Sequence, residues 1–233
     1  MELGADFWSS LLAIVVIDLV LAGDNAIVIG LAARRLPKEM RRKVVVWGTV
    51  GAVAIRSLLT LGVVWLLGIP GLLAAGGLML AWIAYKLLAD EHKHDISAPQ
   101  AGVWAAIRTI IVADAVMGLD NVLAVAGAAH GSFALVVIGL LISVPIVVWG
   151  SGLILKAADR FPAVPYIGAG VLAWTAAKMI AGEPWLKPAA EAVPYGKWYF
   201  AALVVTAVLL LGRAARKKRG AAGSEPLLSR DAS

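Results

Sequence analysis

The amino-acid sequence predicts an all-α membrane protein of about seven transmembrane helices, built as an inverted repeat of three helices plus three, with one extra C-terminal helix. Three observations predict this fold class. The 233 residues are 61% hydrophobic and only 15% charged, whereas soluble domains carry about 25% charged residues. Apolar runs of roughly 20 residues follow one another along the chain. One short polar phrase occurs twice, once in each half of the sequence.

The apolar runs give seven candidate spans, and the mean hydropathy of +0.87 agrees with a chain that lies mostly in the bilayer. The first span is expected to be retained, because its leading residues, MELGADFW, are acidic and carry neither a basic segment nor a small-residue cleavage site. The expected spans are about 7–33, 44–67, 71–89, 107–129, 133–155, 165–182 and 197–212.

The net charge of +6 lies in the loops between the spans, which is typical of a topology signal rather than of nucleic-acid binding. The loop after the first span, RRLPKEMRRK, is the most basic, and alternate loops after it are basic again. The loop 183–197 departs from this pattern, but Glu183 and Glu191 offset its Lys187 and Lys197. The pattern predicts a multi-pass protein of the cell (inner) membrane with its N-terminus outside and its C-terminus in the cytoplasm.

Two domains are expected on these grounds. A transmembrane domain is expected over 1–212. The small, polar and basic residues 213–233 are expected to form a disordered cytoplasmic tail that contacts anionic lipid.

The repeated phrase reads IDLVLAGDNAIVIG at residues 17–30 and ADAVMGLDNVLAVA at residues 113–126. A second match follows, because tryptophan and lysine stand four residues apart in both the third and the sixth span. The first three spans, about 7–89, therefore duplicate as the next three, about 107–182. Three is an odd number, so the two copies must cross the membrane in opposite directions, as in many transporters with a site at the midplane. The matched residues are Asp18, Asp24 and Asn25 with Asp114, Asp120 and Asn121, and Trp82 and Lys86 with Trp174 and Lys178.

The duplicated polar residues are candidates for a metal site. A helix break at Gly23, and another at Gly118, would bring each set together, and broken helices at membrane depth are tolerated where they line a cavity or are buried in protein. The two sets would then contribute four carboxylates and two amides, which suit hard divalent cations such as Mn²⁺, Mg²⁺ or Ca²⁺. The chain has no cysteine, and its three histidines lie in loops or at span ends, which disfavours zinc or copper. Met117 offers a thioether beside the second set.

A structural interpretation stays open beside the metal. Intramembrane aspartates often pair with a base, and Arg56, in the middle of the second span, is the clearest partner. Lys86 and Lys178 are two further candidates. Three bases against four aspartates leave a formal charge of −1. The two lysines stand near span ends, however, where lysine more often extends its amine to the interface.

The paired D-x5-D-N phrases, DLVLAGDNAIVI and DAVMGLDNVLAV, each opening a half of three spans, resemble those of the TerC-like integral membrane proteins. The resemblance extends over roughly 5–182 and is nearest to the short, single-domain YjbE/YkoY-type branch. It implies a multi-span cation transporter associated with manganese export, with a metal path formed by Asp18, Asp24, Asn25, Asp114, Asp120 and Asn121. It implies no appended regulatory domain.

The function expected from these observations is a secondary transporter that exports a divalent cation, most consistent with Mn²⁺, by alternating access. Protons or Na⁺ would be the coupling ion, and no prosthetic group or enzymatic activity is expected. No Gly-rich phosphate loop with lysine is present, which disfavours ATP-driven transport. An intramembrane aspartyl protease fits poorly, because the residues before Asp24 and Asp120 differ from the Gly-x-Gly-Asp phrase of such enzymes. A non-transporting membrane scaffold remains an alternative.

Overall fold

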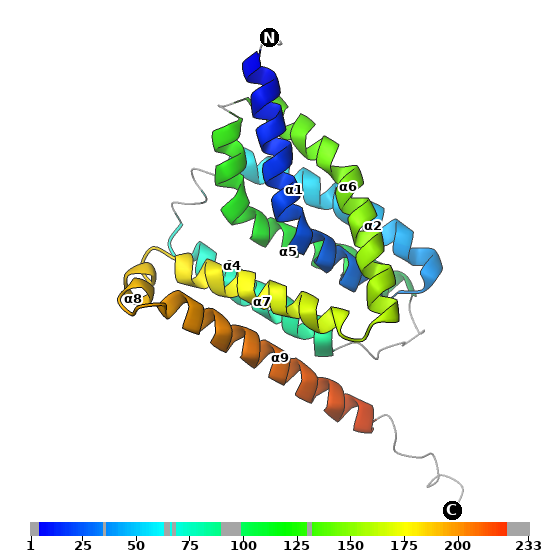
Figure 1. Cartoon of the computed structure of the whole chain (residues 1–233). Helices are drawn as coiled ribbons and strands as arrows, with labels where there is room; N and C mark the ends of the chain where they lie inside the picture. The colour runs from blue at the N-terminus through cyan, green and yellow to red at the C-terminus, as the bar shows by residue number, and fades with distance from the viewer. Residues whose placement is uncertain are drawn as a thin grey trace, which may run out of the picture.

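A computed structural model describes residues 5–34, 36–62, 66, 69–89, 99–129 and 132–222. The described part is helical apart from short turns, which confirms the all-α fold class (Figure 1). Within these residues, seven long helices follow the order of the expected spans, and one short helix lies between the last two. They are α1 (Ala5–Arg34), α2 (Lys38–Leu61), α4 (Leu72–Ala89), α5 (Pro99–Ala128), α6 (Phe133–Arg160), α7 (Val164–Gly182), the short α8 (Lys187–Glu191) and α9 (Gly196–Ala222).

Six of the long helices are each long and apolar enough to cross a membrane, and α1 supplies a seventh span when its two segments are counted together. The segments Phe7–Leu19 and Gly23–Arg34 meet at an angle of 47°. Figure 1 shows this change of direction in the blue helix. The chain is therefore a polytopic membrane protein, and its first span is bent between Leu19 and Gly23.

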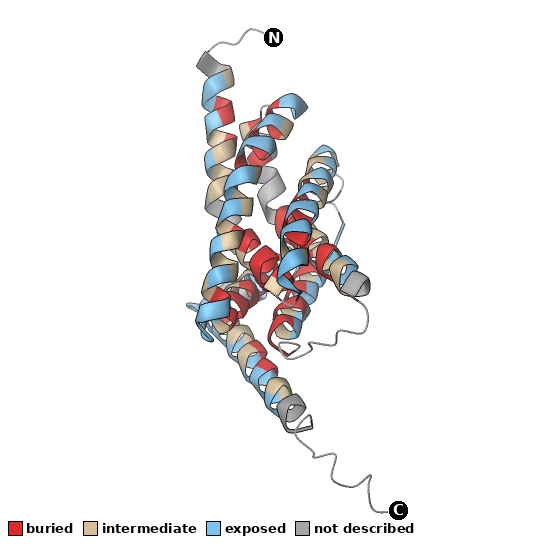
Figure 2. Ribbon diagram, turned by 90° about the vertical axis from the view of Figure 1, so that its right-hand side faces the viewer, coloured by how far each residue is buried: buried red, intermediate tan, exposed pale blue. Residues whose placement is uncertain are grey.

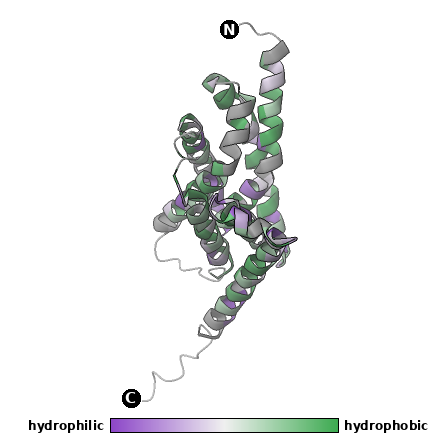
Figure 3. Cartoon of the chain, turned by 90° about the vertical axis from the view of Figure 1, so that its left-hand side faces the viewer, coloured by the Kyte–Doolittle hydropathy of each residue, from purple (hydrophilic) through white to green (hydrophobic). Residues whose placement is uncertain are grey.

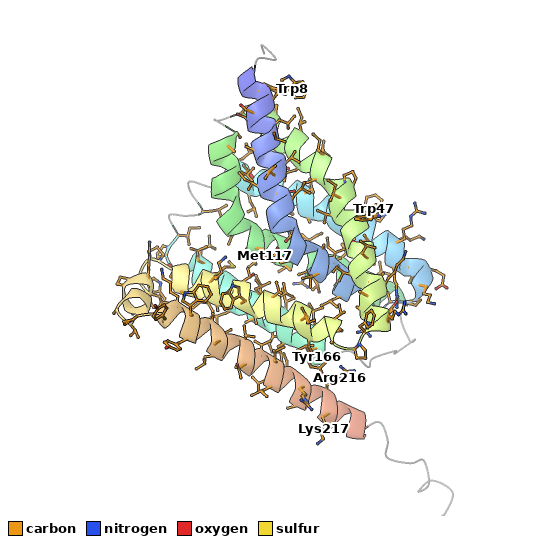
Figure 4. The ribbon with its side chains drawn as sticks, viewed as in Figure 1. Trp8, Trp47, Met117, Tyr166, Arg216 and Lys217 are labelled. Atoms are coloured by element: carbon orange, nitrogen blue, oxygen red, sulfur yellow. The ribbon has the colours of Figure 1, made fainter. Side chains whose placement is uncertain are left out.

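The basic C-terminal segment differs from the expectation. The chain was predicted to lose order from Arg213, but α9 continues to Ala222. The sequence after Arg213 is rich in alanine, lysine and arginine, which have high helix propensity, and cations near a helix C-terminus are favoured by the helix dipole. Arg216 also anchors the helix, because its Nη1 donates to the Tyr166 hydroxyl of α7 at 3.2 Å (Figure 4). Residues 223–233 lie outside the described part.

The helices of the two halves are interleaved. α1 packs chiefly on α6, α2 packs chiefly on α5, and α4 packs on α7. If α1, α2 and α4 are exchanged with α5, α6 and α7 in that order, the same three helix pairs result. A duplication predicts this symmetry. The last helix, α9, lies outside the pattern and covers α4 and α7 (Figure 1).

Two matched glycines allow the interleaved helices to approach closely. Gly48 of α2 faces Ile110 of α5, and Gly139 of α6 faces Ile14 of α1. A Cβ atom would lie 2.7 Å from the side chain of Ile110 and 2.5 Å from that of Ile14. Ile14 and Ile110 each stand four residues before the first aspartate of their phrase, so the two contacts are equivalent in the two halves.

The outer surface of the bundle is apolar, as a bilayer requires. Large hydrophobic side chains on α1, α2, α6 and α9 are exposed, among them Trp8, Trp47, Trp149 and Leu203. Figure 2 shows buried residues along the faces where helices meet, and Figure 3 shows hydrophobic residues continuing onto the outward faces. Trp8 and Trp47 project from the ribbon in Figure 4.

The two ends of the bundle are each held by a carboxylate. At one end, Asp159 of α6 pairs with Arg34 at 3.5 Å and with Arg41 at 2.5 Å, joining the end of α1 and the start of α2 to the end of α6. At the other end, Glu183 accepts hydrogen bonds from the backbone N–H groups of Gly71 at 2.7 Å and Ala74 at 3.1 Å.

Glu183 corrects one sequence-based interpretation. The sequence places it in the loop 183–197 as an offset to Lys187 and Lys197, but it is only 1% exposed and binds backbone N–H groups instead. The first N–H groups of a helix lack partners within the helix and carry partial positive charge, so a carboxylate is stabilised there. Glu183 therefore joins the end of α7 to the start of α4.

Candidate functional site

A buried arginine lies between the two halves, and the first aspartate of each phrase pairs with it. Arg56 of α2 donates through Nη1 to Asp18 of α1. It donates through Nη2 and Nε to the two oxygens of Asp114 of α5, the Nε contact at 3.3 Å. All three side chains are buried. The fork of the guanidinium matches the two oxygens of Asp114, which is the geometry of strong arginine–carboxylate pairs.

A fourth helix contributes a hydroxyl. Ser143 of α6 donates to Asp18, and its hydroxyl also lies 2.9 Å from the carbonyl oxygen of Leu140. Helices α1, α2, α5 and α6 thus meet at one polar cluster, defined here as Asp18, Arg56, Asp114 and Ser143. Ser143 was not among the predicted site residues, although it is a polar side chain within an apolar span, and that signal was available in the sequence.

The cluster is symmetric in its carboxylates and asymmetric in its partners. Gly48 of α2 and Gly139 of α6 contact equivalent isoleucines, so they occupy equivalent positions in the two halves. Counting from these glycines, the position equivalent to Arg56 is Val147, and the position equivalent to Ser143 is Ala52. One guanidinium therefore serves the aspartates of both halves. Its charge leaves the cluster at a formal −1. A buried carboxylate without a full countercharge is costly, so this site favours the presence of further cations.

Asp24 and Asn25 lie next to the cluster, just after the bend in α1. Asp24 is partly buried, and its Oδ1 accepts from the Asn25 backbone N–H at 3.2 Å. Its carboxylate lies in the electrostatic field of Arg56 and Lys178. Asn25 is buried, and its Oδ1 has no hydrogen-bond partner in the structure as described. Buried polar atoms are nearly always satisfied, so this oxygen calls for a bound water or ion.

The two predicted helix breaks differ. Gly23 begins the second segment of α1, and a Cβ atom there would meet nothing within 4 Å. Gly118 lies inside α5, which runs as one helix from Pro99 to Ala128, so no break is found there. A Cβ atom on Gly118 would lie 3.8 Å from Arg56, so this residue borders the guanidinium stem instead.

The remaining predicted residues take different places. The backbone of Asp120 and Asn121 belongs to α5, but their side chains lie outside the described part. Met117 is buried in the main apolar core and packs there (Figure 4). Lys178 is exposed on α7. Lys86 is exposed near the end of α4, where it lines a groove between α4 and α5.

The described side chains alone do not form a metal centre. Among them, no three histidine, aspartate or glutamate side chains converge closely enough to hold an ion. Arg56 occupies the space between Asp18 and Asp114 instead. Among the described contacts, neither Asp24 nor Asn25 hydrogen-bonds to Arg56, so their oxygens are the described groups of the first phrase that remain outside the cluster.

Comparison with known proteins places these features in a family. The sequence matches the family described as Integral membrane protein TerC over residues 3–220. An uncharacterized membrane protein of Bacillus subtilis, YjbE, is 50% identical over 175 residues, which cover 75% of this chain and 80% of that protein. A second Bacillus subtilis membrane protein, YkoY, is 23% identical over 72% of this chain and 58% of its own length. The Escherichia coli protein YegH is 26% identical over 52% of this chain and 27% of its own length. No solved structure matches the chain.

Proposed function

Because the chain belongs to the integral membrane protein TerC family, we propose that it is a secondary transporter that exports a divalent metal cation, Mn²⁺, across the cell membrane. The two halves would rock against each other around the cluster at their junction. The observation that carries the proposal is that equivalent aspartates of the two halves converge on one buried point, with Asp24 and an unsatisfied Asn25 oxygen beside it.

The charge balance supports a cation as the substrate. Asp18, Asp24 and Asp114 outnumber Arg56 and Lys178, the two cations near them, and leave a formal charge of −1 beside the bend of α1. A bound cation would offset that charge. The available ligands are carboxylate and amide oxygens, which suit Mn²⁺, Mg²⁺ or Ca²⁺ better than a thiolate-preferring metal.

Arg56 would couple metal binding to movement of the two halves. In the state described here the guanidinium acts as a tethered cation that holds Asp18 and Asp114 together. A metal bound at Asp24 and Asn25 would compete electrostatically with Arg56 for these carboxylates. Its arrival would loosen the contact that joins α2 to α1 and α5. Binding of the substrate and rearrangement of the two halves would thereby be linked.

Export requires an energy source. In an inside-negative cell, moving a dication outward is uphill by about 4.6 kcal/mol per 100 mV, twice the value for one charge. Exchange for protons or Na⁺ would supply this energy, and the same carboxylates are suitable carriers of the counter-ion.

The test is Mn²⁺ uptake into inverted vesicles that contain the purified protein, with Ca²⁺, Mg²⁺ and Zn²⁺ compared with and without a pH gradient. Asp24→Asn and Asp120→Asn are each expected to abolish Mn²⁺ movement while membrane insertion stays intact. Asp159→Asn is the matched control, because it makes the same change at the end of the bundle and should retain transport. Undiminished uptake in both site variants would refute the proposal.

One observation favours a second candidate. Pairing of Asp18 and Asp114 with Arg56 is also what a non-transporting membrane scaffold would use to hold its helices together. Deletion of the gene should sensitise cells to excess manganese if the protein exports the metal. Unchanged manganese tolerance, together with no uptake in vesicles, would favour the scaffold.

A further inference from the structure

The second segment of α1, Gly23–Arg34, leads from the candidate site to the end of the bundle that the basic loops predict to face the cytoplasm. Asp24 and Asn25 stand at its start, just after the bend, and Arg34 is its last residue. At the rise of an α-helix, Asp24 and Arg34 are about 15 Å apart along this segment. A cation that reaches Asp24 from the cytoplasm would have to pass alongside it.

Helix α6 packs closely against this segment. A Cβ atom on Gly30 would lie 3.0 Å from the carbonyl oxygen of Ser151 and 2.9 Å from the side chain of Ile154, both on α6. Ser151 is 0% exposed. Buried apolar residues of α1, α2 and α5 form one cluster beside this contact, and Val147 and Val148 of α6 pack against that cluster. Apolar packing of this kind excludes an ion, so the contact is closed in the state described here.

Asp159 of α6 fastens the cytoplasmic end of this contact. Its carboxylate pairs with Arg34 at 3.5 Å and with Arg41 at 2.5 Å. Arg41 also donates through Nη2 to the carbonyl oxygen of Arg34 and through Nε to that of Leu36, each at 2.9 Å. The Asp159 side chain is 40% exposed. Breaking these pairs therefore costs no more than breaking a surface ion pair, whereas the packing behind them stays dry.

The ion pairs of Asp159 are not a product of the duplication. Counting from the equivalent glycines of α2 and α6, the position equivalent to Asp159 is Gly68, and the position equivalent to Arg41 is Ser132. These two residues cannot form an arginine–carboxylate pair. The halves of an inverted repeat can exchange their arrangements, so a contact that exists in only one half favours the state in which its end is closed.

We propose that the segment Gly23–Arg34 is a cytoplasmic gate and that Asp159 is the latch that holds it shut against α6. This gate rests on the proposed function, because it assigns the opening to the path of the exported cation. The bend before Gly23 supplies the hinge, and a Cβ atom on Gly23 would meet nothing within 4 Å. When the pairs of Asp159 break, the segment can move away from α6 and admit a cation to Asp24.

Thiol labelling of the full chain tests the gate, because the sequence has no cysteine. Ser151→Cys is a nearly isosteric probe that is buried on the same helix as Asp159. Ser10→Cys is the matched probe, because Ser10 is also buried but lies near the opposite end of α1. The purified protein, in neutral detergent and without metal, is treated with a water-soluble maleimide, and the labelling rate is measured by mass spectrometry. Both thiols should label slowly when Asp159 is present.

Adding Asp159→Asn should raise the labelling rate of Ser151→Cys about fivefold, which is the upper range for the loss of an exposed ion pair. It should not raise the labelling rate of Ser10→Cys. Asp159→Glu keeps the charge and should keep Ser151→Cys protected. Glu39→Gln removes an exposed carboxylate from the same end of the bundle and should also leave Ser151→Cys protected.

An unchanged labelling rate of Ser151→Cys in the Asp159→Asn protein would overturn the latch. Equal increases at the two thiols would also overturn it, because Asp159→Asn would then loosen the whole bundle instead of one end. Transport should persist in Asp159→Asn, since the residues of the cluster are unchanged. The labelling needs no metal, so a failure of Mn²⁺ uptake would refute the proposed function without deciding whether the segment opens.

Discussion

The two halves of the molecule share a scaffold and differ in their charges. Gly48 with Ile110 and Gly139 with Ile14 form the same helix contact twice, and each half supplies one aspartate to the buried cluster. The partners of those aspartates are not duplicated, because Arg56 comes from the first half and Ser143 from the second. The two halves therefore share equivalent helix contacts, while the residues that set the charge of the centre differ between them.

The largest expected effect comes from removing the shared guanidinium. Arg56→Met leaves Asp18 and Asp114 buried without a countercharge, and the expected loss is about 3–5 kcal/mol of unfolding free energy. Thermal unfolding of the purified protein in detergent measures it. Adding Asp18→Asn and Asp114→Asn to Arg56→Met should recover part of the loss. An Arg56→Met protein as stable as the wild type would mean that the cluster contributes nothing to holding the halves together.

A smaller loss of unfolding free energy is expected when the Ser143 hydroxyl, which has no equivalent in the first half, is removed. Ser143→Ala removes a hydrogen bond to the Asp18 carboxylate, which is worth about 1.5–3 kcal/mol when the partner is charged. Ser143→Thr keeps the hydroxyl and is the matched control in the same unfolding measurement. If the two variants lose equal stability, the effect of position 143 is one of volume and not of the hydrogen bond.

The shared scaffold is tested by a matched pair of glycine substitutions. Gly48→Ala and Gly139→Ala each place a methyl group within 3 Å of a buried isoleucine. Overpacking of this kind costs about 1–3 kcal/mol. Equal losses of stability in the two variants are expected if the contacts are equivalent. Gly152→Ala is the control, because a Cβ atom there meets nothing within 4 Å. A large loss of stability in only one of the two variants would show that the two glycine contacts are not equivalent.

The smallest effect is expected at the end of the bundle. Glu183→Gln keeps the shape of the side chain and removes the charge that interacts with the start of α4, for an expected loss of about 0.5–2 kcal/mol. Glu39→Gln removes an exposed carboxylate from the first turn of α2, where only the helix dipole acts, and should lose less stability. Unfolding in detergent at low ionic strength compares them, and indistinguishable midpoints would contradict the capping role of Glu183.

Local pattern predicted the all-α fold and its membrane-spanning helices, because hydropathy is a property of the sequence itself. Arg56 could be named as a partner because a base within an apolar span has few alternatives. The sequence did not reveal that Arg56 would take one aspartate from each half, since that depends on how α2 packs against α1 and α5. Glu183 was missed for the same reason, because its burial depends on the start of α4, more than 100 residues away.

The residues after Arg213 carry two opposing local signals. Their net charge and small size predict disorder, but their alanine, lysine and arginine content favours a helix, which continues to Ala222. At the cluster, the helical repeat alone would place Asp18 and Asn25 on one face. In the structure Asp18 pairs with Arg56, while the Asn25 amide oxygen is left unsatisfied just beyond the bend.

The interleaving of the halves has a consequence for biosynthesis. The chain enters the membrane from its N-terminus, so α1 and α2 are inserted before α5 and α6 exist. Arg56 can meet Asp18 at once, but Asp114 arrives 58 residues later. Ser143 follows later still, 125 residues after Asp18. The main packing faces of the first half are therefore uncovered until the second half is inserted, and the interleaved assembly is complete only after α7 has joined α4.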